Sequence, residues 1–343
     1  MRAVTYAGDG AVRVAQVPDP RIEQPTDAVV EIRRSAVCGT DLHLLAHDEG
    51  LPAGSVLGHE FVGQVVETGT AVRGHRVGDL VVGADFVACG TCWWCRRGDH
   101  WECAERRFFG TGTAFGPPLA GTQAELVRVP HADTVLRTVP DGVSLDAAVF
   151  LGDTLATGYA AVRRADLQPG DTVAVVGGGP VGQLTALAAQ ACGAGAVLLV
   201  EPVASRRAVA GREGSVAVAP EEAVAAAHGL TDGRGADVVV DAIGGPRGLG
   251  TAFGLVRRRG TVVSVGVHDG PWELPAGRAF ADELTLRFAI GDLMRDGDRL
   301  LALVRCGAVD PTVLVEDRVS LTDAPDAYQR MSQRRTLKSL IVF

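Results

Sequence analysis

Short apolar runs with the residue preferences of strands, separated by Gly and Pro, dominate the first 150 positions. They are rich in β-branched residues, which pack well on a pleated surface. The clearest of these runs are residues 28–32, 61–66 and 124–129. This part of the chain is therefore predicted to form a small, irregular all-β unit.

The pattern changes after about residue 152. Continuous apolar runs of the kind found in buried strands now alternate with helical stretches, which is typical of an α/β fold with a parallel sheet. The expected strands are residues 172–176, 196–201, 237–242 and 261–267, and a helix is expected at 181–192. After about residue 288 the pattern predicts one more helix, at 299–306, and a final strand, at 339–343.

The composition fits an ordinary globular protein: 343 residues are enough for about two domains, and 47% are hydrophobic and 22% charged. A formal net charge of -8 argues against a nucleic acid as partner, because such a partner requires a basic surface. No apolar run approaches the roughly 18 residues of a membrane-spanning helix, and the N-terminus lacks the apolar core of a signal peptide. We therefore expect a cytoplasmic protein with no membrane partner.

Four of the seven cysteines lie within 15 positions, in the spacing C-x2-C-x2-C-x7-C: Cys89, Cys92, Cys95 and Cys103. An odd number of cysteines with this clustering indicates metal binding in a reducing compartment, not a disulfide framework. Four thiolates on one loop can close a tetrahedral shell around zinc with no open position, which defines a structural site. The alternatives are an iron–sulfur cluster, whose bacterial ferredoxin spacing is absent here, and a chance grouping.

A glycine-rich turn follows the expected strand at 172–176 and opens the expected helix at 181–192. The pattern G-x-G-x-x-G is weak evidence alone, but in this strand–turn–helix context it predicts a dinucleotide-binding loop. Glycines allow the backbone to approach a pyrophosphate closely, and the N-terminus of the helix meets its charge. The residues of the loop are Gly177, Gly179, Pro180, Val181 and Gly182.

Glu201 ends the next expected strand, nineteen residues after Gly182. A carboxylate at this place can accept both ribose hydroxyls of NAD and repels a 2′-phosphate, so NAD is the expected cofactor. Arg206 and Arg207 follow shortly and could pair with adenosine phosphate groups, which keeps NADP as the alternative. A third interpretation is that Glu201 is only a solvated strand end.

Two short motifs contain zinc-ligand types and groups for proton transfer. The first, C-G-T-D-L-H, contains Cys38, Thr40 and His43, and the second, G-H-E, contains His59 and Glu60. Zinc accepts a thiolate, an imidazole and a carboxylate as ligands, and a neighbouring hydroxyl offers a path for a proton. A single Cys or His is more often a buried structural residue, but the cysteine cluster and the glycine loop favour a functional site here.

Together with L-G-D-T-L-A-T-G-Y at 151–159, these motifs resemble those of the zinc-dependent medium-chain alcohol dehydrogenases, most of all the threonine, polyol and formaldehyde dehydrogenase-like branches. The resemblance covers essentially the whole chain. It implies a GroES-like, β-rich catalytic domain at 1–153 with the structural zinc loop, a Rossmann NAD-binding domain at 154–287, and a C-terminal return to the catalytic domain at 288–343. It also implies a homodimer or homotetramer, in which a strand at about 284–290 could pair across a two-fold axis.

The resemblance also implies which residues hold a catalytic zinc ion. Cys38 and His59 match the first two ligands. Asp153 falls where relatives carry the third ligand, and Glu60, which in the family can replace water or a ligand on zinc, is the alternative. An open fourth position would take the substrate oxygen. With the cysteine loop, two zinc ions per chain are therefore expected.

Other roles follow from the same resemblance. Thr40 matches the hydroxyl that contacts the substrate oxygen, and His43 matches the residue that passes the proton to solvent. The alternative for these two residues is a turn hydroxyl and a surface histidine. Thr157 matches a contact to the nicotinamide. The strand end that holds the carboxamide of the cofactor corresponds to Val265, Gly266 and Val267.

The expected activity is oxidation of a polar or secondary alcohol to an aldehyde or ketone. Zinc lowers the pKa of the alcohol so that an alkoxide forms, and a hydride then passes to NAD. Asp85 stands where relatives often place an apolar pocket residue, which suggests a polar substrate, although it could equally cap a loop. The alternatives are an NADPH-dependent carbonyl reductase of a biosynthetic pathway, a dismutase-like enzyme that retains its nicotinamide, and a non-catalytic nucleotide-binding protein of the same fold.

Overall fold

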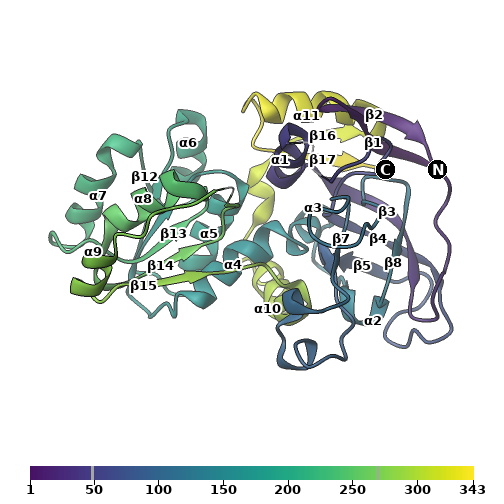
Figure 1. Ribbon diagram of the computed structural model, residues 1–343, viewed down its shortest axis with the longest axis horizontal. Coiled ribbons are helices and arrows are strands. Elements are labelled where there is room, and N and C mark those ends of the chain that lie inside the picture. Colours follow the sequence, from purple (N-terminus) through teal and green to yellow (C-terminus); the bar gives the residue numbers. More distant parts are fainter. Residues whose placement is uncertain (48–49, 269) are drawn as a thin grey trace. The chain divides into compact units, whose positions relative to one another are not determined.

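The computed structural model describes residues 1–47, 50–268 and 270–343 (Figure 1). The chain divides into two compact units. The first consists of Met1–Asp153, Asp292–Arg305 and Val315–Phe343, and the second of Thr154–Gly291 and Cys306–Leu314.

A seven-stranded sheet with the order β16-β17-β3-β4-β5-β9 organises the first unit, and β8 also pairs with β3. Its strands are β3 (Ala28–Ala36), β4 (Phe61–Thr68), β5 (Leu80–Gly83), β8 (Leu126–Val129), β9 (Leu136–Thr138), β16 (Val315–Ser320) and β17 (Lys338–Val342). Two smaller sheets pair β1 (Arg2–Gly8) with β2 (Ala11–Gln16) and β6 (Phe86–Val87) with β7 (Arg107–Phe108). The three strand-like runs expected in this part of the sequence therefore correspond to β3, β4 and β8.

Short helices lie within the first 150 residues, so the prediction that this part is all-β is wrong, and two further helices join the unit from the C-terminal segment. They are α1 (Gly39–His47), α2 (Ala132–Val135), α3 (Leu145–Ala148), α10 (Leu293–Arg305) and α11 (Ala324–Ser332), with 3-10 turns at Cys95–Arg97, His100–Glu102, Val149–Leu151 and Leu321–Asp323. Helix α1 has nine residues, too few for a stable isolated helix. Its Leu44 and Leu45 are buried in a core with Tyr328 and Met331 of α11, and this packing holds the helix in place.

The second unit is a six-stranded parallel sheet with the order β12-β11-β10-β13-β14-β15. Its strands are β10 (Thr172–Val176), β11 (Ala196–Val200), β12 (Val216–Val218), β13 (Ala236–Asp241), β14 (Val256–Ser264) and β15 (Thr285–Phe288). The helices are α4 (Thr154–Arg164), α5 (Pro180–Ala191), α6 (Ala204–Arg212), α7 (Ala223–Leu230), α8 (Gly245–Leu255) and α9 (Ala276–Ala281), with 3-10 turns at Pro220–Glu222 and Pro311–Leu314. Every residue of β10 is buried, in agreement with its uninterrupted apolar sequence.

The C-terminal segment differs from the expectation in one stretch. Residues 292–305 and 315–343 join the first unit, but Cys306–Leu314 joins the second. The 3-10 turn in this stretch packs against α5, and its Pro311 and Leu314 are buried there. Burying these apolar side chains favours this placement over a continuous return from residue 288.

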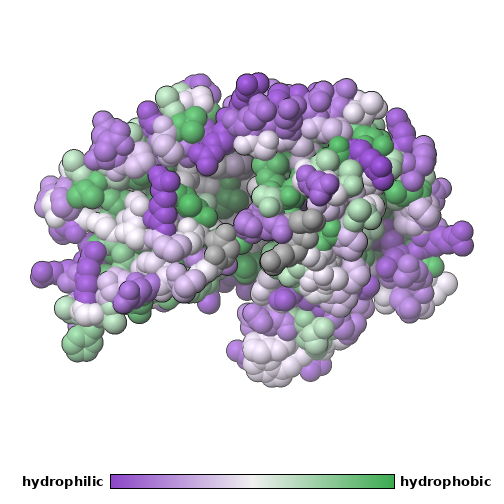
Figure 2. Space-filling model, turned by 45° about the horizontal axis from the view of Figure 1, so that its top comes forward, coloured by the Kyte–Doolittle hydropathy of each residue, from purple (hydrophilic) through white to green (hydrophobic). Residues whose placement is uncertain are grey.

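Hydrophilic side chains cover much of the surface in view, with smaller hydrophobic areas between them (Figure 2). Among the described residues, no helix has both the length and the apolar composition needed to cross a membrane.

Candidate functional site

Cys38, His59 and Asp153 lie together in the first unit although they are distant in sequence. Cys38 follows β3 and His59 precedes β4, and these two strands are antiparallel neighbours. The Oδ2 atom of Asp153 lies 3.3 Å from the Sγ atom of Cys38 and 3.3 Å from the Nε2 atom of His59. All three ligand atoms lie within 4.8 Å of one another, so they could hold one metal ion.

The state of His59 fits a metal ligand. Its side chain is fully buried, and within the described residues neither ring nitrogen has a hydrogen bond. Buried polar atoms are nearly always satisfied. A cation between the thiolate, the imidazole and the carboxylate would satisfy Nε2, and a Cys-His-carboxylate set with an open position is a known zinc environment.

Burial and mutual charge shift the pKa values of all three side chains of the trio. Burial alone would raise the pKa of Asp153, but the close approach and charge of His59, with the charge of Lys338, lower it to about 2. Burial alone would lower the pKa of His59, but the charges of Asp41 and Cys38 raise it well above its usual value. Burial and the charge of Asp153 raise the pKa of Cys38, so a metal ion that binds the trio would displace protons from Cys38 and His59.

Asp41, on the first turn of α1, supports two of these residues. Its Oδ2 atom accepts the backbone N–H of Cys38 at 3.0 Å, and its Oδ1 atom lies 3.4 Å from Nδ1 of His59. Asp41 was not among the site residues expected from the sequence, although its place inside the C-G-T-D-L-H motif and the preference of ligand histidines for a carboxylate partner could have suggested a role.

Glu60 lies outside this trio. Its carboxylate pairs with the ammonium of Lys338 from β17, and both side chains are fully buried. Lys338 also lies over the ring of Phe150, at 5.7 Å from its centroid. Lys338 was not expected from the sequence; the signal that could have found it is that the only lysine of the sequence stands at the start of a mostly apolar final strand.

Thr40 and His43 are both on α1. The Oγ1 atom of Thr40 lies 3.9 Å from Sγ of Cys38, so its hydroxyl borders the trio. The half-buried His43 ring contacts the ring of His47, with centroids 4.4 Å apart. No direct hydrogen bond joins Thr40 to His43 in the described residues, so proton transfer between them needs a bridging group.

Asp85 is buried beside the start of β6, with 4% of its surface exposed. Burial and the charge of Asp153 raise its pKa well above the usual value, although His59 opposes this. Its Oδ1 atom has no hydrogen bond within the described residues. A neutral, buried carboxyl with free hydrogen-bonding capacity can bind a polar group of a ligand.

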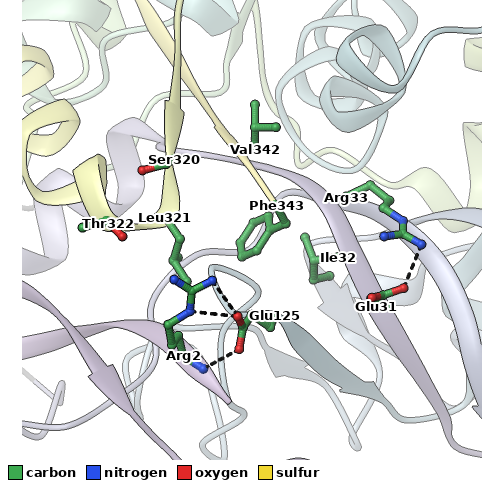
Figure 3. Close-up of a pocket in the computed structure, with 10 residues that line it drawn as sticks. All are labelled: Arg2, Glu31, Ile32, Arg33, Glu125, Ser320, Leu321, Thr322, Val342 and Phe343. Atoms are coloured by element: carbon green, nitrogen blue, oxygen red, sulfur yellow. Dashed lines mark hydrogen bonds and ion pairs between the residues drawn. The ribbon is translucent and has the colours of Figure 1, made fainter.

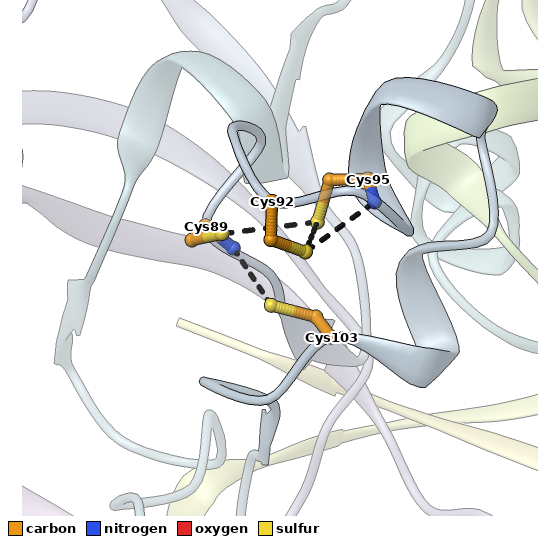
Figure 4. Close-up of side chains that lie close together, drawn as sticks. All are labelled: Cys89, Cys92, Cys95 and Cys103. Carbon is orange, nitrogen blue, oxygen red and sulfur yellow. Dashed lines mark hydrogen bonds between the residues drawn. The ribbon is translucent and has the colours of Figure 1, made fainter.

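The four clustered cysteines also converge, and their side chains point toward one another on one loop (Figure 4). The Sγ atoms of Cys92 and Cys95 are 3.4 Å apart, and all seven cysteines are free of disulfides. Backbone N–H groups donate to Sγ of Cys103 and of Cys92. Although burial raises the pKa of Cys89, hydrogen bonds from Thr91 and Cys92 lower it to about 6, which favours the thiolate that a metal binds.

A separate pocket of about 260 Å³ in the first unit shares no residue with these clusters (Figure 3). Its charged side chains form two ion pairs, Arg2 with Glu125 and Arg33 with Glu31, each at 2.8 Å. Among the described residues that line the pocket, the charged side chains are therefore paired with one another.

In the second unit, the glycine loop follows β10 as expected. Gly177 has φ +103°, and a Cβ atom on Gly182 would lie 1.8 Å from the carbonyl oxygen of Gly177, so both positions require glycine. Gly179 is the N-cap of α5, and Pro180 occupies its first turn, where the missing N–H costs nothing. Val181 is the second residue of α5, so the N-terminus of this helix directly follows the glycine loop.

Glu201 supports this loop directly. Its Oε2 atom accepts the backbone N–H of Gly178 at 2.7 Å, and its Oε1 atom accepts that of Val203 at 2.9 Å. Each carboxylate oxygen keeps a further lone pair that could accept a ribose hydroxyl. Arg207 donates to the carbonyl oxygen of Glu201, whereas the guanidinium of Arg206 has no protein partner in the described part of the chain.

The remaining candidate cofactor contacts also belong to the second unit. Thr157 lies on α4 beside Gly291, where a Cβ atom would lie 2.6 Å from its Oγ1 atom. The segment of Val265, Gly266 and Val267 directly follows β14. The backbone N–H groups of Val265 and Gly266 donate to the carbonyl oxygen of Asp241, which ties this segment to the end of β13.

Two parts of the chain match known families. Residues 24–141 match the alcohol dehydrogenase GroES-like domain, and residues 180–304 match the zinc-binding dehydrogenase family. The expected α/β fold, a GroES-like domain with a Rossmann-like parallel sheet, is confirmed.

Individual proteins agree with this assignment. The chain is 37% identical over 330 residues to a protein of Mycobacterium tuberculosis named as a probable zinc-binding alcohol dehydrogenase, with 96% of this chain and 84% of the relative covered. The structure of the alcohol dehydrogenase TADH from Thermus sp. ATN1 is similar, with a TM-score of 0.96, 37% identity, and 100% and 99% of the two chains covered. A zinc-binding dehydrogenase from Sinorhizobium meliloti bound to NADP has a TM-score of 0.87 and 30% identity, with 100% and 99% covered. The chain belongs to the zinc-dependent medium-chain dehydrogenase/reductase family and is an oxidoreductase that acts on alcohol groups.

Proposed function

We propose that this oxidoreductase is a zinc- and NAD-dependent dehydrogenase that oxidises a polar or secondary alcohol to a ketone or aldehyde. The observation that carries the proposal is the buried trio of Cys38, His59 and Asp153, whose ligand atoms lie within 4.8 Å of one another. In a purely structural cluster, the buried ring nitrogens of His59 would be expected to form hydrogen bonds. In the described residues they form none, which favours a metal ligand. The glycine loop and Glu201 in the second unit support a dinucleotide as hydride acceptor.

The trio would hold the catalytic zinc ion, with Asp153 as the third ligand. Glu60 is the weaker candidate because its carboxylate already pairs with Lys338. When bound, zinc supplies a Lewis acid that lowers the pKa of an alcohol group. Thr40 borders the trio, so its hydroxyl could relay the substrate proton, and a bridging group would carry that proton to His43, which passes it to solvent.

Thr157 and the segment 265–267 would orient the nicotinamide for hydride transfer, since both belong to the second unit and the segment directly follows the end of β14. Gly177 to Gly182 would bind the pyrophosphate at the N-terminus of α5. Two residues bear on the choice between NAD and NADP at the adenosine ribose. Glu201 favours NAD, and the guanidinium of Arg206, which has no partner among the described residues, favours NADP. We propose NAD because Glu201 is already held beside the loop by its hydrogen bond to Gly178.

A second zinc ion would be held by Cys89, Cys92, Cys95 and Cys103. Because four thiolates fill its coordination, this ion stabilises the loop and takes no part in the reaction. Zinc content therefore separates the active enzyme, with about two ions per chain, from a non-catalytic relative, with about one.

The substrate would carry a polar group besides the reacting hydroxyl, because Asp85 presents an unsatisfied oxygen within the same unit as the trio. The main alternative is a carbonyl reductase that works in the opposite direction with NADPH. Arg206 is the observation that favours it.

We further propose a cytoplasmic homodimer. Strand β15 has only β14 as a neighbour in the described sheet, so its other edge is open for pairing with a second copy. The absence of disulfides among the seven cysteines supports a reducing compartment. Light scattering after gel filtration tests the dimer, and a monomer at micromolar concentration would contradict it.

The experiment for the proposed activity is NADH formation with a panel of polyols, amino alcohols and simple alcohols, each with NAD and with NADP. Zinc-loaded protein is compared with a Cys38→Ser variant and with a Cys306→Ser control, whose cysteine is exposed. Turnover of a polar alcohol with NAD that is lost only in Cys38→Ser supports the proposal. Reduction of carbonyls with NADPH, and no alcohol oxidation, would favour the alternative.

A further inference from the structure

Two more buried side chains, Gln123 and Tyr328, extend the hydrogen-bond network from Asp41 away from the metal-ligand trio. The amide Nε2 atom of Gln123 donates to the carbonyl oxygen of Ala36 at 3.0 Å and lies 3.4 Å from Oδ2 of Asp41. The hydroxyl of Tyr328 donates to Oε1 of Gln123 at 2.8 Å. Gln123 is fully buried, and Asp41 and Tyr328 are nearly so.

These contacts permit only one orientation of the Gln123 amide. A flipped amide would place Oε1 against the carbonyl oxygen of Ala36 and the carboxylate of Asp41, and both of those groups are acceptors. It would also place the NH₂ group against the hydroxyl of Tyr328. Burial and the charge of Asp41 raise the pKa of Tyr328 well above its usual value, so its hydroxyl stays protonated and can donate. Tyr328 and Ala36 together therefore direct a donor at Asp41.

The amide in turn orients Asp41. Its Oδ2 atom receives both the backbone N–H of Cys38 and the amide of Gln123, which leaves Oδ1 facing Nδ1 of His59 at 3.4 Å. Neither Oδ1 nor Nδ1 has another hydrogen bond within the described chain. A proton on Nδ1 shared with Oδ1 satisfies both atoms and leaves Nε2 as the lone-pair donor toward a metal.

The backbone next to His59 makes room for this arrangement. Gly58 has φ +90°, and a Cβ atom there would lie 2.4 Å from Cγ of Gln123. The glycine before the ligand histidine is thus required both for its backbone conformation and for the amide of Gln123.

We propose that Gln123 and Tyr328 are positioning residues for the zinc ligand His59 and act through Asp41. This inference rests on the proposed zinc site of Cys38, His59 and Asp153. Helix α11, which carries Tyr328, would then help to hold the metal site. Tyr328 lies almost 270 residues from His59 in the sequence. Ligand histidines held by such partners bind metal more tightly, because the ring is fixed before the metal arrives.

The test measures zinc release to a colorimetric chelator from fully loaded protein. The release phase that is missing in Cys38→Ser belongs to the catalytic site, and the remaining phase belongs to the four-cysteine site. Tyr328→Phe removes one hydroxyl and should accelerate the catalytic phase about 5- to 10-fold, because one hydrogen bond is lost. Tyr6→Phe is the matched control, since it removes another buried tyrosine hydroxyl of the same unit, one that accepts the N–H of Gly10.

A double-mutant cycle shows whether Tyr328 acts through Asp41. Asp41→Asn alone should weaken zinc binding about 10- to 100-fold, and adding Tyr328→Phe to it should cause no further loss. Replacing zinc by Co²⁺ gives a spectroscopic readout, and the visible absorption of the catalytic site should change in Tyr328→Phe and not in Tyr6→Phe.

Equal release rates in Tyr328→Phe and Tyr6→Phe, or additive losses in the double variant, would overturn the inference. A wild-type protein that has no release phase sensitive to Cys38→Ser would instead overturn the proposed zinc site itself. Far-ultraviolet circular dichroism and retention of the four-cysteine phase show that each variant is folded.

Discussion

The ammonium of Lys338 and the carboxylate of Glu60 form an ion pair with no exposed surface on either side chain. Each of these buried charges is stabilised by the other, because a single buried charge has an unfavourable desolvation free energy that nothing offsets. Burial and the charge of Asp153 raise the pKa of Glu60 while Lys338 lowers it, so the pair lies within reach of the charge of the metal-ligand trio. It therefore keeps one carboxylate in the site without adding a net negative charge.

Replacing Lys338 should therefore destabilise the folded protein. Lys338→Met leaves Glu60 buried with no cation, and the free energy of unfolding in urea should fall by about 3–5 kcal/mol. Adding Glu60→Gln to Lys338→Met removes the isolated charge and should restore part of the loss. As a control, Arg76→Met breaks an exposed pair with Asp79 and should cost no more than about 1 kcal/mol. If Lys338→Met were as stable as Arg76→Met, the buried pair would have no structural importance.

The four-cysteine loop should behave as a structural zinc site. Cys103→Ser should lower the zinc content from about two to about one ion per chain and lower the melting temperature, because binding energy contributes to folding. Cys192→Ser removes a half-buried cysteine outside both clusters and should change neither quantity. Retention of both zinc ions in Cys103→Ser would show that this loop binds no metal.

Glu201 should determine the choice of cofactor. Glu201→Ala should weaken NAD binding about 10- to 100-fold, as expected for loss of charged hydrogen bonds, and weaken NADP binding less. Arg206→Ala should do the reverse. Both dissociation constants are measured by nicotinamide fluorescence. An equal loss for NAD and NADP in Glu201→Ala would mean that Glu201 only supports the loop through Gly178 and Val203.

Asp85 should act as a neutral hydrogen-bonding group, because burial raises its pKa well above its usual value. Asp85→Asn keeps the shape and polarity of a protonated carboxyl, so KM for a polyol should change by only a few-fold. Asp85→Leu removes the hydrogen bond and should raise KM for the polyol about 10-fold, while simple alkyl alcohols are unaffected or improved. An unchanged preference in Asp85→Leu would remove Asp85 from the substrate pocket.

Local patterns in the sequence were sufficient for some of the strands and for the glycine loop. The strand at 172–176 and the glycine loop after it are encoded by neighbouring residues, and both appear where they were expected. The strand expected at 261–267 is instead Val256–Ser264, because the charged start of β14 hides its strand character; Arg257 pairs there with Asp237. Helix α1 was missed because its stability comes from distant apolar partners in α11.

The support of the metal site could not be predicted from the sequence. Lys338 lies 278 residues from Glu60, and Tyr328 lies 205 residues from Gln123, so no local spacing connects them. A buried lysine or tyrosine acquires its role only when the sheet brings β17 and α11 to β3 and β4. Asp41 is intermediate, since its motif was evident but its contact with His59 was not.

The most direct measurement of the central claim is zinc content and NAD-linked alcohol oxidation in the same samples of wild-type, Cys38→Ser and Cys306→Ser protein. The account predicts about two zinc ions and turnover of a polar alcohol in the wild type and in Cys306→Ser. In Cys38→Ser it predicts about one zinc ion and a loss of turnover of at least about 1,000-fold. Full zinc content or undiminished turnover in Cys38→Ser would contradict it.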